Sequence, residues 1–370
     1  MNKLGFGFLR LPLLNPEDDG SVDFEATNKL VDSFMEKGGN YFDTGYLYHN
    51  GNSEVALREC LVKRYPRESF RLVDKIPSWK VKAPEDCEKF FATQLERCGV
   101  EYFDTYMLHW LNDRNYGIAV KNGEFDFLNK LKAEGKAKAI GFSYHDNAEV
   151  LDKILTEQPQ IDYVQLQINY LDWESLSIEA KKCYEVAVKH GKKVIVMEPV
   201  KGGTLAKLPE EAEAVLKAAN PEASIASWGI RFASQLENVE IVLSGMNNEE
   251  QIADNMKDAA PFTEAETEAL AKAVEIMNAE AGFPCTGCNY CAPNCPMNIA
   301  IPQYFSMYNE RTRMKGDGWK VDVGYAHLTK VKGKASECIE CGACEENCPQ
   351  KLTIIENLKK VAEVFEPKRG

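Results

Sequence analysis

The chain has 370 residues, long enough for one large domain and a smaller one, or for two to three ordinary domains. Hydrophobic residues make up 44% and charged residues 27% of it, a composition typical of folded globular proteins that argues against disorder. The net charge of −13 argues against nonspecific binding to nucleic acid or to anionic membranes.

The sequence predicts no membrane segment, because no apolar run approaches the ~18–20 residues that a span needs. The N-terminal stretch MNKLGFGFLRLPLLNPEDD reaches proline and acids where a signal-peptide cleavage site would lie. We therefore expect a cytoplasmic protein.

Short apolar runs alternate with amphipathic stretches over the first two thirds of the chain. Between these runs, apolar residues recur three and four positions apart. This spacing predicts helices at 23–37, 53–63, 85–98, 124–134, 148–156, 178–190 and 224–234. The runs predict strands at 4–9, 40–44, 70–76, 102–109, 137–143, 162–169, 193–197 and 239–244. Eight strands alternating with helices over ~240 residues fit a (β/α)₈ barrel. The rival, a doubly wound open sheet, usually has a glycine-rich turn after its first strand, and none stands here.

Two further helices are expected at 248–257 and 264–280, and the composition changes at AGFPC, residues 281–285. We therefore predict a barrel domain over 1–280 and a small, mainly helical domain over 281–370. Within the second domain, IPQYFSMYNERTRMK (301–315) has a helical pattern.

The chain has twelve cysteines, and eight of them lie in two short motifs of the second domain. CTGCNYCAPNCP and CIECGACEENCP both fit C-x₂-C-x₂-C-x₃-C-P, the pattern of bacterial ferredoxins that bind [4Fe–4S] clusters. In this pattern three thiolates bind one cluster and the fourth reaches the other. The predicted ligand sets are Cys285, Cys288, Cys291 with Cys348, and Cys338, Cys341, Cys344 with Cys295. Zinc is the alternative metal for these cysteines, but two matching motifs that both end in Cys-Pro disfavour it.

The spacer of 42 residues between the motifs is longer than in compact ferredoxins. In this respect the domain resembles the helical dicluster ferredoxin domains attached to larger oxidoreductases. The other four cysteines, Cys60, Cys87, Cys98 and Cys183, are expected to be ordinary buried residues.

Several stretches of the barrel region resemble the aldo-keto reductases, in the order and at the spacing of that family. These are LGFGFLRLP, YFDTGYLYHNGNSE, LVDKIP, YMLHW and IGFSYHD. Together with the cysteine motifs, the resemblance indicates the iron–sulfur-containing branch of that family. It implies a catalytic tetrad of Asp43, Tyr48, Lys75 and His109.

The residue types of this tetrad suit carbonyl reduction. Tyrosine is a weak acid with a pKa near ~10, so Lys75 would be needed to stabilise the phenolate of Tyr48. Asp43 would hold Lys75 in place, and His109 would orient the substrate carbonyl. Each residue also has a structural explanation: packing for Tyr48 and His109, and an ion pair for Asp43 with Lys75. Tyr46 is the nearest alternative acid.

The resemblance also implies contacts with a nicotinamide cofactor. Two strand-end residues, Ser143 and Gln165, match family positions beside the nicotinamide, but Tyr144 replaces the usual asparagine. Met197 stands where an aromatic residue is common. Gly202, Gly203, Ser244 and Gly245 lie in the loops after strands seven and eight, where barrels often bind phosphate. Asn255 matches the family's asparagine near the adenine. Because SGMNNEEQIADN contains no Lys or Arg, NADH is favoured over NADPH.

Three functions remain open at this point. The first is reduction of a small carbonyl compound, or oxidation of an alcohol, with NAD(P)H and electrons linked to two [4Fe–4S] clusters. The second adds a flavin, which can exchange electrons both singly and in pairs. The third is a redox-partner protein whose barrel only docks other proteins. An electron-transfer protein is a possible partner, and Trp79, Trp110, Trp173 and His145 are candidate residues of a substrate pocket.

Overall fold

The structure, a computed structural model, describes residues 3–257, 260–280, 282–285, 287–313, 318–348 and 350–367. By packing, the chain divides into two units. The first contains Met1–Trp173, Ala180–Ala206 and Ala223–Phe262, and the second contains Glu174–Glu179, Lys207–Glu222 and Thr263–Gly370. The domain boundary after residue 280 stays a prediction.

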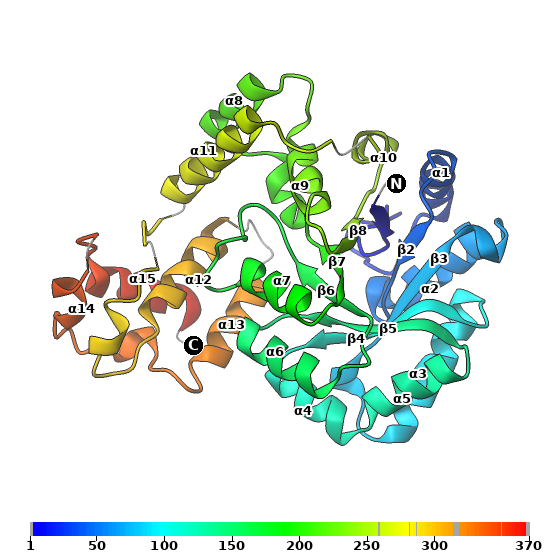
Figure 1. Cartoon of the computed structure of the whole chain (residues 1–370), viewed down its shortest axis with the longest axis horizontal. Helices are drawn as coiled ribbons and strands as arrows, with labels where there is room; N and C mark the ends of the chain where they lie inside the picture. Colours follow the sequence, from blue (N-terminus) through cyan, green and yellow to red (C-terminus); the bar gives the residue numbers. More distant parts are fainter. Residues whose placement is uncertain are drawn as a thin grey trace. The chain divides into compact units, whose positions relative to one another are not determined.

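The first unit is a closed barrel of eight parallel strands in sequence order, as predicted. It closes where β1 pairs with β8, with Phe6 opposite Ser244. Figure 1 shows the helices of this unit around the strands. The strands are β1 (Leu4–Gly7), β2 (Tyr41–Asp43), β3 (Arg71–Ile76), β4 (Phe103–Leu111), β5 (Ala137–Tyr144), β6 (Tyr163–Gln167), β7 (Lys193–Met197) and β8 (Val239–Ser244).

The helices of the barrel unit cover the outside of the strands through an apolar layer that includes Phe42, Leu72, Leu108 and Val242. Several begin at a polar residue whose side chain accepts a backbone N–H, such as Asp23 before the first helix. The helices are α1 (Phe24–Glu36), α2 (Asn52–Leu57), α3 (Pro84–Cys98), α4 (Asp113–Lys121), α5 (Glu124–Ala133), α6 (Ala148–Glu157), α7 (Ala180–Lys189), α9 (Ile225–Ser234) and α10 (Glu249–Asn255).

Three strand ends differ from the prediction by two residues, and several others differ by one. The sixth strand ends at Gln167 instead of residue 169. The first strand ends at Gly7, and the apolar run continues as a turn in which Phe8 is buried and Leu9 is exposed. Hydrophobicity does not distinguish a strand from a buried turn, so the predicted strand was too long. The fourth strand extends two residues beyond the prediction, through Trp110 at a φ of 62°.

The second unit is helical. Its core contains Ile301, Phe305, Ile354 and Leu358 together with Cys291, Cys344 and Cys348. The predicted helical stretch after Met297 begins at Ile301, but its last residues, 314–315, lie outside the described residues, as does Pro349 of the second motif. The helices are α8 (Glu210–Ala219), α11 (Glu264–Glu280), α12 (Ile301–Arg313), α13 (Trp319–Leu328), α14 (Ala343–Glu346) and α15 (Ile354–Phe365).

Among the described residues, no helix combines the length and apolar character that crossing a bilayer requires.

Candidate active site and thiol-lined cavities

Four predicted site residues continue the inward-facing layer of the barrel toward the carboxyl ends of its strands. Tyr41, Val73, Met107 and Ile195 belong to a buried cluster inside the barrel. Alternate residues of a strand share a face, so the residues two positions later point the same way. Those residues are Asp43, Lys75, His109 and Met197, and all four belong to the predicted site.

Asp43 and Lys75 form a buried ion pair. The Lys75 ammonium lies 2.5 Å from Oδ1 of Asp43 and 2.6 Å from the backbone oxygen of Thr44. Burial alone would lower the pKa of Lys75, but the Asp43 carboxylate opposes it and the net pKa is raised. Burial raises the pKa of Asp43 against the pull of Lys75. Lys75 therefore keeps its positive charge at neutral pH.

Tyr48 lies between this ion pair and His109. Its hydroxyl is 3.4 Å from Nε2 of His109, and the Lys75 ammonium is 5.3 Å from the centroid of its ring. Burial raises the pKa of Tyr48, and the charge of Lys75 offsets only part of that rise. The expected stabilisation of the phenolate is thus present but weaker than the effect of burial, so Tyr48 is protonated at neutral pH.

An aromatic wall adjoins His109. The ring of Trp79 lies 5.3 Å from that of His109 and 5.5 Å from that of Trp110, and Trp110 lies 6.3 Å from His145. Three of the four candidate pocket residues therefore come together. The fourth, Trp173, packs instead on Tyr184 and Phe232.

Tyr46, the alternative acid, lies outside this group. Its ring packs on Phe90 at 4.9 Å and under the guanidinium of Arg97 at 4.7 Å. Its environment is a packing contact with α3, which leaves Tyr48 as the tyrosine beside Lys75 and His109.

The two residues predicted beside a nicotinamide are neighbours in the barrel. Ser143 and Gln165 are paired across β5 and β6, and both are buried. The Ser143 hydroxyl accepts the backbone N–H of Trp110 at 2.8 Å, so its own proton remains available for donation. Oε1 of Gln165 is buried without a hydrogen-bond partner among the described residues. A buried amide oxygen of this kind fits a ligand that donates a hydrogen bond, such as a carboxamide.

The predicted phosphate contacts also lie at the carboxyl ends of their strands. After β7, Gly202 and Gly203 have φ of 64° and 97°, a backbone conformation that favours glycine. Near the end of β8, the Asn255 amide donates to the Ser244 hydroxyl at 2.9 Å, and both residues are buried.

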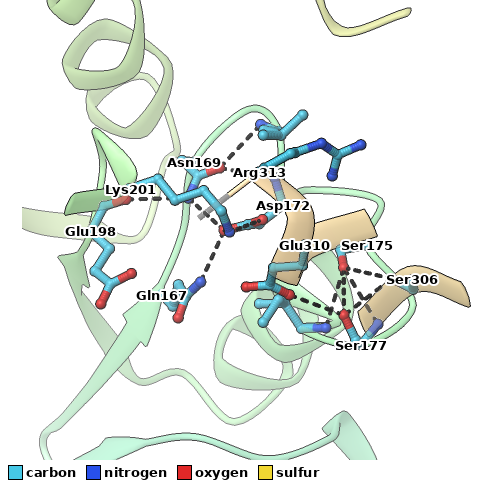
Figure 2. Close-up of polar contacts among 12 residues, drawn as sticks. Gln167, Asn169, Asp172, Ser175, Ser177, Glu198, Lys201, Ser306, Glu310 and Arg313 are labelled. Carbon is cyan, nitrogen blue, oxygen red and sulfur yellow. Dashed lines mark hydrogen bonds and ion pairs between the residues drawn. The ribbon is translucent and has the colours of Figure 1, made fainter. Parts of the chain in front are cut away.

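The sequence analysis missed a buried network at the ends of β6 and β7. Lys201 lies 2.7 Å from Oδ1 of Asp172, and both side chains are buried. The amides of Gln167 and Asn169 donate to the same carboxylate at 2.9 and 2.7 Å (Figure 2). Burial would raise the pKa of Asp172, but Lys201 and the amides hold it below its ordinary value. Lys201 follows β7 and precedes two glycines in a loop where barrels often bind phosphate, but its charge is engaged in the ion pair with Asp172.

The short segment after Trp173 belongs to the second unit. The hydroxyls of Ser175 and Ser177 lie 3.4 and 3.1 Å from that of Ser306 on α12 (Figure 2). The Ser177 hydroxyl also donates to Glu310 at 3.2 Å. A Cβ at Gly287, between two cysteines of the first motif, would lie 2.4 Å from a side-chain carbon of Leu176. This segment therefore packs against the first cysteine motif.

Two cavities of the second unit are each lined by four cysteines. One is lined by Cys285, Cys288, Cys291 and Cys348. The other is lined by Cys295, Cys338, Cys341 and Cys344. The structure thus brings together the same two sets that the motif predicts, three cysteines from one motif and the fourth from the other. No group of three or more His, Cys, Asp or Glu side chains in the described part of the chain is placed to hold a single metal ion.

The described residues of the two cysteine motifs have positive φ at equivalent positions. Positive φ occurs at Gly287 and Glu340, at Asn289 and Gly342, and at Asn298 and Lys351, which are equivalent positions of the two motifs. In each motif a helix begins at the sixth residue after the fourth cysteine, at Ile301 in α12 and at Ile354 in α15. The duplication seen in the sequence therefore extends to the fold.

Comparisons with known proteins match both parts of the chain. The family model described as the aldo/keto reductase family matches residues 3–275, and the model described as a 4Fe-4S dicluster domain matches residues 284–353. A stretch of 177 residues is 29% identical to the NADH-specific methylglyoxal reductase of Escherichia coli (strain K12), covering 42% of this chain and 52% of that protein. An aldo-keto reductase of Mycobacterium sp. (strain MCS) is 26% identical over 241 residues, or 64% of this chain and 78% of the relative. The chain thus spans about half the length of the Escherichia coli relative.

Solved structures share the fold. The holo form of an aldo-keto reductase from Bacillus halodurans has a TM-score of 0.60 at 21% identity, over 73% of this chain and 91% of that one. An aldo-keto reductase from Klebsiella pneumoniae, in complex with NADPH, has a TM-score of 0.59 at 18% identity, over 73% and 90%. At these identities the likeness shows the fold alone.

Proposed function

Because the chain belongs to the aldo/keto reductase family and carries a 4Fe-4S dicluster domain, we propose that it reduces a small carbonyl compound, or oxidises the corresponding alcohol, with NAD(P)H. The observation that carries this proposal is the position of the Tyr48 hydroxyl, 3.4 Å from Nε2 of His109 and beside the ammonium of Lys75. These residues extend an inward face of the barrel at the carboxyl ends of its strands, where barrel active sites are built.

The proposed roles follow from charge and position. A reduced nicotinamide, when bound, would supply the hydride that the carbonyl carbon takes up. Tyr48 donates its proton to the carbonyl oxygen, which becomes the hydroxyl of the alcohol. Lys75 stabilises the phenolate left behind, and Asp43 keeps Lys75 in place through the ion pair of 2.5 Å. His109, within hydrogen-bonding distance of Tyr48, orients the substrate oxygen beside the aromatic wall.

Several buried groups support a nicotinamide cofactor. The unpartnered Oε1 of Gln165 could accept from a carboxamide, and the Ser143 hydroxyl could donate to it. Met197 would cover a ring face. The loop residues Gly202, Gly203, Ser244, Gly245 and Asn255 would hold the phosphates and the adenosine. We favour NADH, because residues 244–255 contain no Lys or Arg and a relative is named as NADH-specific.

We further propose that the second unit holds two [4Fe–4S] clusters. The ligands of one would be Cys285, Cys288, Cys291 and Cys348, and those of the other Cys295, Cys338, Cys341 and Cys344. Each cluster would carry one electron at a time. We therefore propose an electron-transfer protein as the partner that exchanges electrons with the clusters. A flavin in the barrel stays a prediction, as does the docking role.

The test compares Tyr48→Phe with Tyr46→Phe in the full-length protein, purified without oxygen and loaded with iron and sulfide. Turnover of methylglyoxal and other small carbonyls with NADH is measured. We expect Tyr48→Phe to lose activity by about 10²–10⁴-fold, the usual worth of a general acid. Tyr46→Phe, which changes a packing contact, and the visible spectrum of the clusters serve as controls and should stay as in the wild type. Equal activity in Tyr48→Phe and the wild type would refute the proposal.

A further inference from the structure

A groove on the second unit lies beside the cavity of the second cysteine motif. It has a volume of about 560 Å³ and is lined by residues from the start of that motif and from α15. Two of them, Cys338 and Ile355, also line the cavity that Cys338 shares with the other three cysteines of its set. The groove therefore reaches a ligand of the proposed second cluster, and the Cys338 side chain belongs to the wall between the two.

The lining of this groove is acidic. Glu340, Glu363 and Glu366 contribute carboxylates, and Lys359 is the one cation among the described residues that line it. The Lys359 ammonium lies 3.1 Å from Oε1 of Glu340 and 2.9 Å from Oε1 of Glu356, so its charge is already matched by carboxylates. The groove therefore keeps a net negative charge.

Two of these carboxylates meet no cation. In the described part of the chain, the exposed carboxylate of Glu363 belongs to no ion pair. Glu366 accepts hydrogen bonds from the hydroxyls of Tyr325 and Ser336, which are neutral donors and leave its charge in place. Surface charges of one sign attract molecules of the opposite charge before contact. The groove therefore attracts a positively charged surface.

The first cysteine motif lacks this charge. CTGCNYCAPNCP contains no acidic or basic residue, whereas CIECGACEENCP contains three glutamates. Exposed apolar side chains also stand beside the acidic groups: Ile339, next to Cys338 in the sequence, is 59% exposed, and Val364, next to Glu363, is 40% exposed. Apolar groups with charged groups around them are typical of surfaces that bind proteins.

We propose that this groove docks a basic electron-transfer protein, which exchanges single electrons with the second cluster. The inference rests on the proposed function and deepens it, because it gives the docking site and the charge of the proposed partner. One electron leaves the reduced cluster beside Cys338 and reduces the oxidised redox group of the partner; the reverse transfer reduces the cluster. Lys and Arg side chains of the partner would face Glu340, Glu363 and Glu366.

The probe for the test is oxidised cytochrome c, a small basic haem protein. The full-length protein is loaded with iron and sulfide, its clusters are reduced without oxygen, and reduction of the haem is followed after rapid mixing. The second-order rate constant should fall about 10-fold as ionic strength rises from about 0.01 M to about 0.15 M, because salt screens the attraction. Cytochrome c with acetylated lysines keeps the haem and loses the basic charge, so it should react about 10-fold more slowly at low ionic strength.

Matched variants locate the attraction. Glu363→Lys reverses a charge that lines the groove and should lower the rate constant about 10-fold at low ionic strength. Glu363→Gln removes the charge only and should fall between Glu363→Lys and the wild type. Glu268→Lys makes the same reversal at an exposed position on α11 that does not line the groove, and should react like the wild type. Iron and sulfide analysis checks that all forms carry the same clusters.

The outcomes separate the inference from the proposed function. If Glu363→Lys and Glu268→Lys lose the same rate, cytochrome c responds only to the total charge of the protein, and the inference is overturned. An unchanged rate in Glu363→Lys, or with acetylated cytochrome c, also overturns it. Turnover of methylglyoxal with NADH by the same preparations decides the proposed carbonyl reduction independently. A protein without reducible clusters overturns both the inference and the proposed pair of clusters.

Discussion

The ammonium of Lys201 lies 2.7 Å from the carboxylate of Asp172, and the two buried side chains join the loop after β7 to the loop after β6. The same carboxylate accepts hydrogen bonds from Gln167 and Asn169 (Figure 2). A buried charge that keeps its partner is tolerated, whereas one that loses its partner is costly. The pair therefore fixes the loop that carries Gly202 and Gly203.

Asp172→Asn should lower the free energy of unfolding by about 3–5 kcal/mol, because it leaves the Lys201 ammonium buried without a counter-charge. Urea denaturation followed by tryptophan fluorescence measures the change. The control is Glu25→Gln, which breaks the exposed pair with Lys29 and should cost about 0–1 kcal/mol. If both variants lose the same free energy of unfolding, the buried pair contributes no more to stability than an exposed pair.

Lys75→Met should raise the pKa of Tyr48 further, because it removes the positive charge that opposes the effect of burial. Alcohol oxidation needs the Tyr48 phenolate, so its rate rises with pH up to the pKa of Tyr48. In Lys75→Met this rise should move to higher pH, with a rate at neutral pH about 10²–10⁴-fold lower. Lys80→Met, at an exposed lysine after the same strand, should keep the wild-type profile. An unshifted profile in Lys75→Met would separate Lys75 from the ionisation of Tyr48.

Glu124, at the start of α5, should make the free energy of unfolding depend on pH. Burial raises the pKa of Glu124 from 4.5 to about 7, against a smaller opposing effect of the nearby Ser78. A pKa raised on folding favours the folded state at low pH, and this contribution is lost as pH rises from about 4.5 through about 7. At 1.36 kcal/mol for each pKa unit, the free energy of unfolding should fall by about 3 kcal/mol over that range.

Glu124→Gln, which stays neutral, should remove this slope, so the variant is more stable than the wild type at pH 8. Urea denaturation from pH 4 to pH 8 compares the two proteins with Glu149→Gln, an exposed position on α6 that should keep the slope. A wild-type slope in Glu124→Gln would assign the pH dependence to other groups.

Each cavity is lined by cysteines of both motifs, so the iron lost in a double variant should depend on which two cysteines are replaced. Two [4Fe–4S] clusters contain about eight iron atoms per chain. Cys285→Ser with Cys348→Ser alters one cavity only, so about four iron atoms should remain after reconstitution. Cys285→Ser with Cys295→Ser alters both cavities and should leave far less iron. Iron and sulfide analysis gives the result; the reverse order would place Cys348 and Cys295 in the cavities of their own motifs.

Much of the fold could be predicted from period and spacing. Alternation by two residues placed Asp43 on the same side of its strand as Tyr41, and the order of strands followed from their alternation with helices. The helix at 354–365 was missed, although Ile354, Leu358 and Val361 recur at helical spacing and are buried. Strand ends such as Phe8 were harder, because an apolar residue can be buried in a turn as well as in a strand.

The sequence was sufficient for the features that depend on neighbours along the chain: the barrel order, the two cysteine motifs, and the positions of Asp43, Lys75 and His109 toward the ends of their strands, with Tyr48 shortly after β2. The partner of Lys201, the groove beside Cys338 and the direction of the pKa shift of Tyr48 depend on folding in three dimensions. Each is set by charges and volumes that distant loops bring together, and electrostatic energy depends on distance in space and on burial. The spacing of residues along the chain gives neither their distance in space nor their burial.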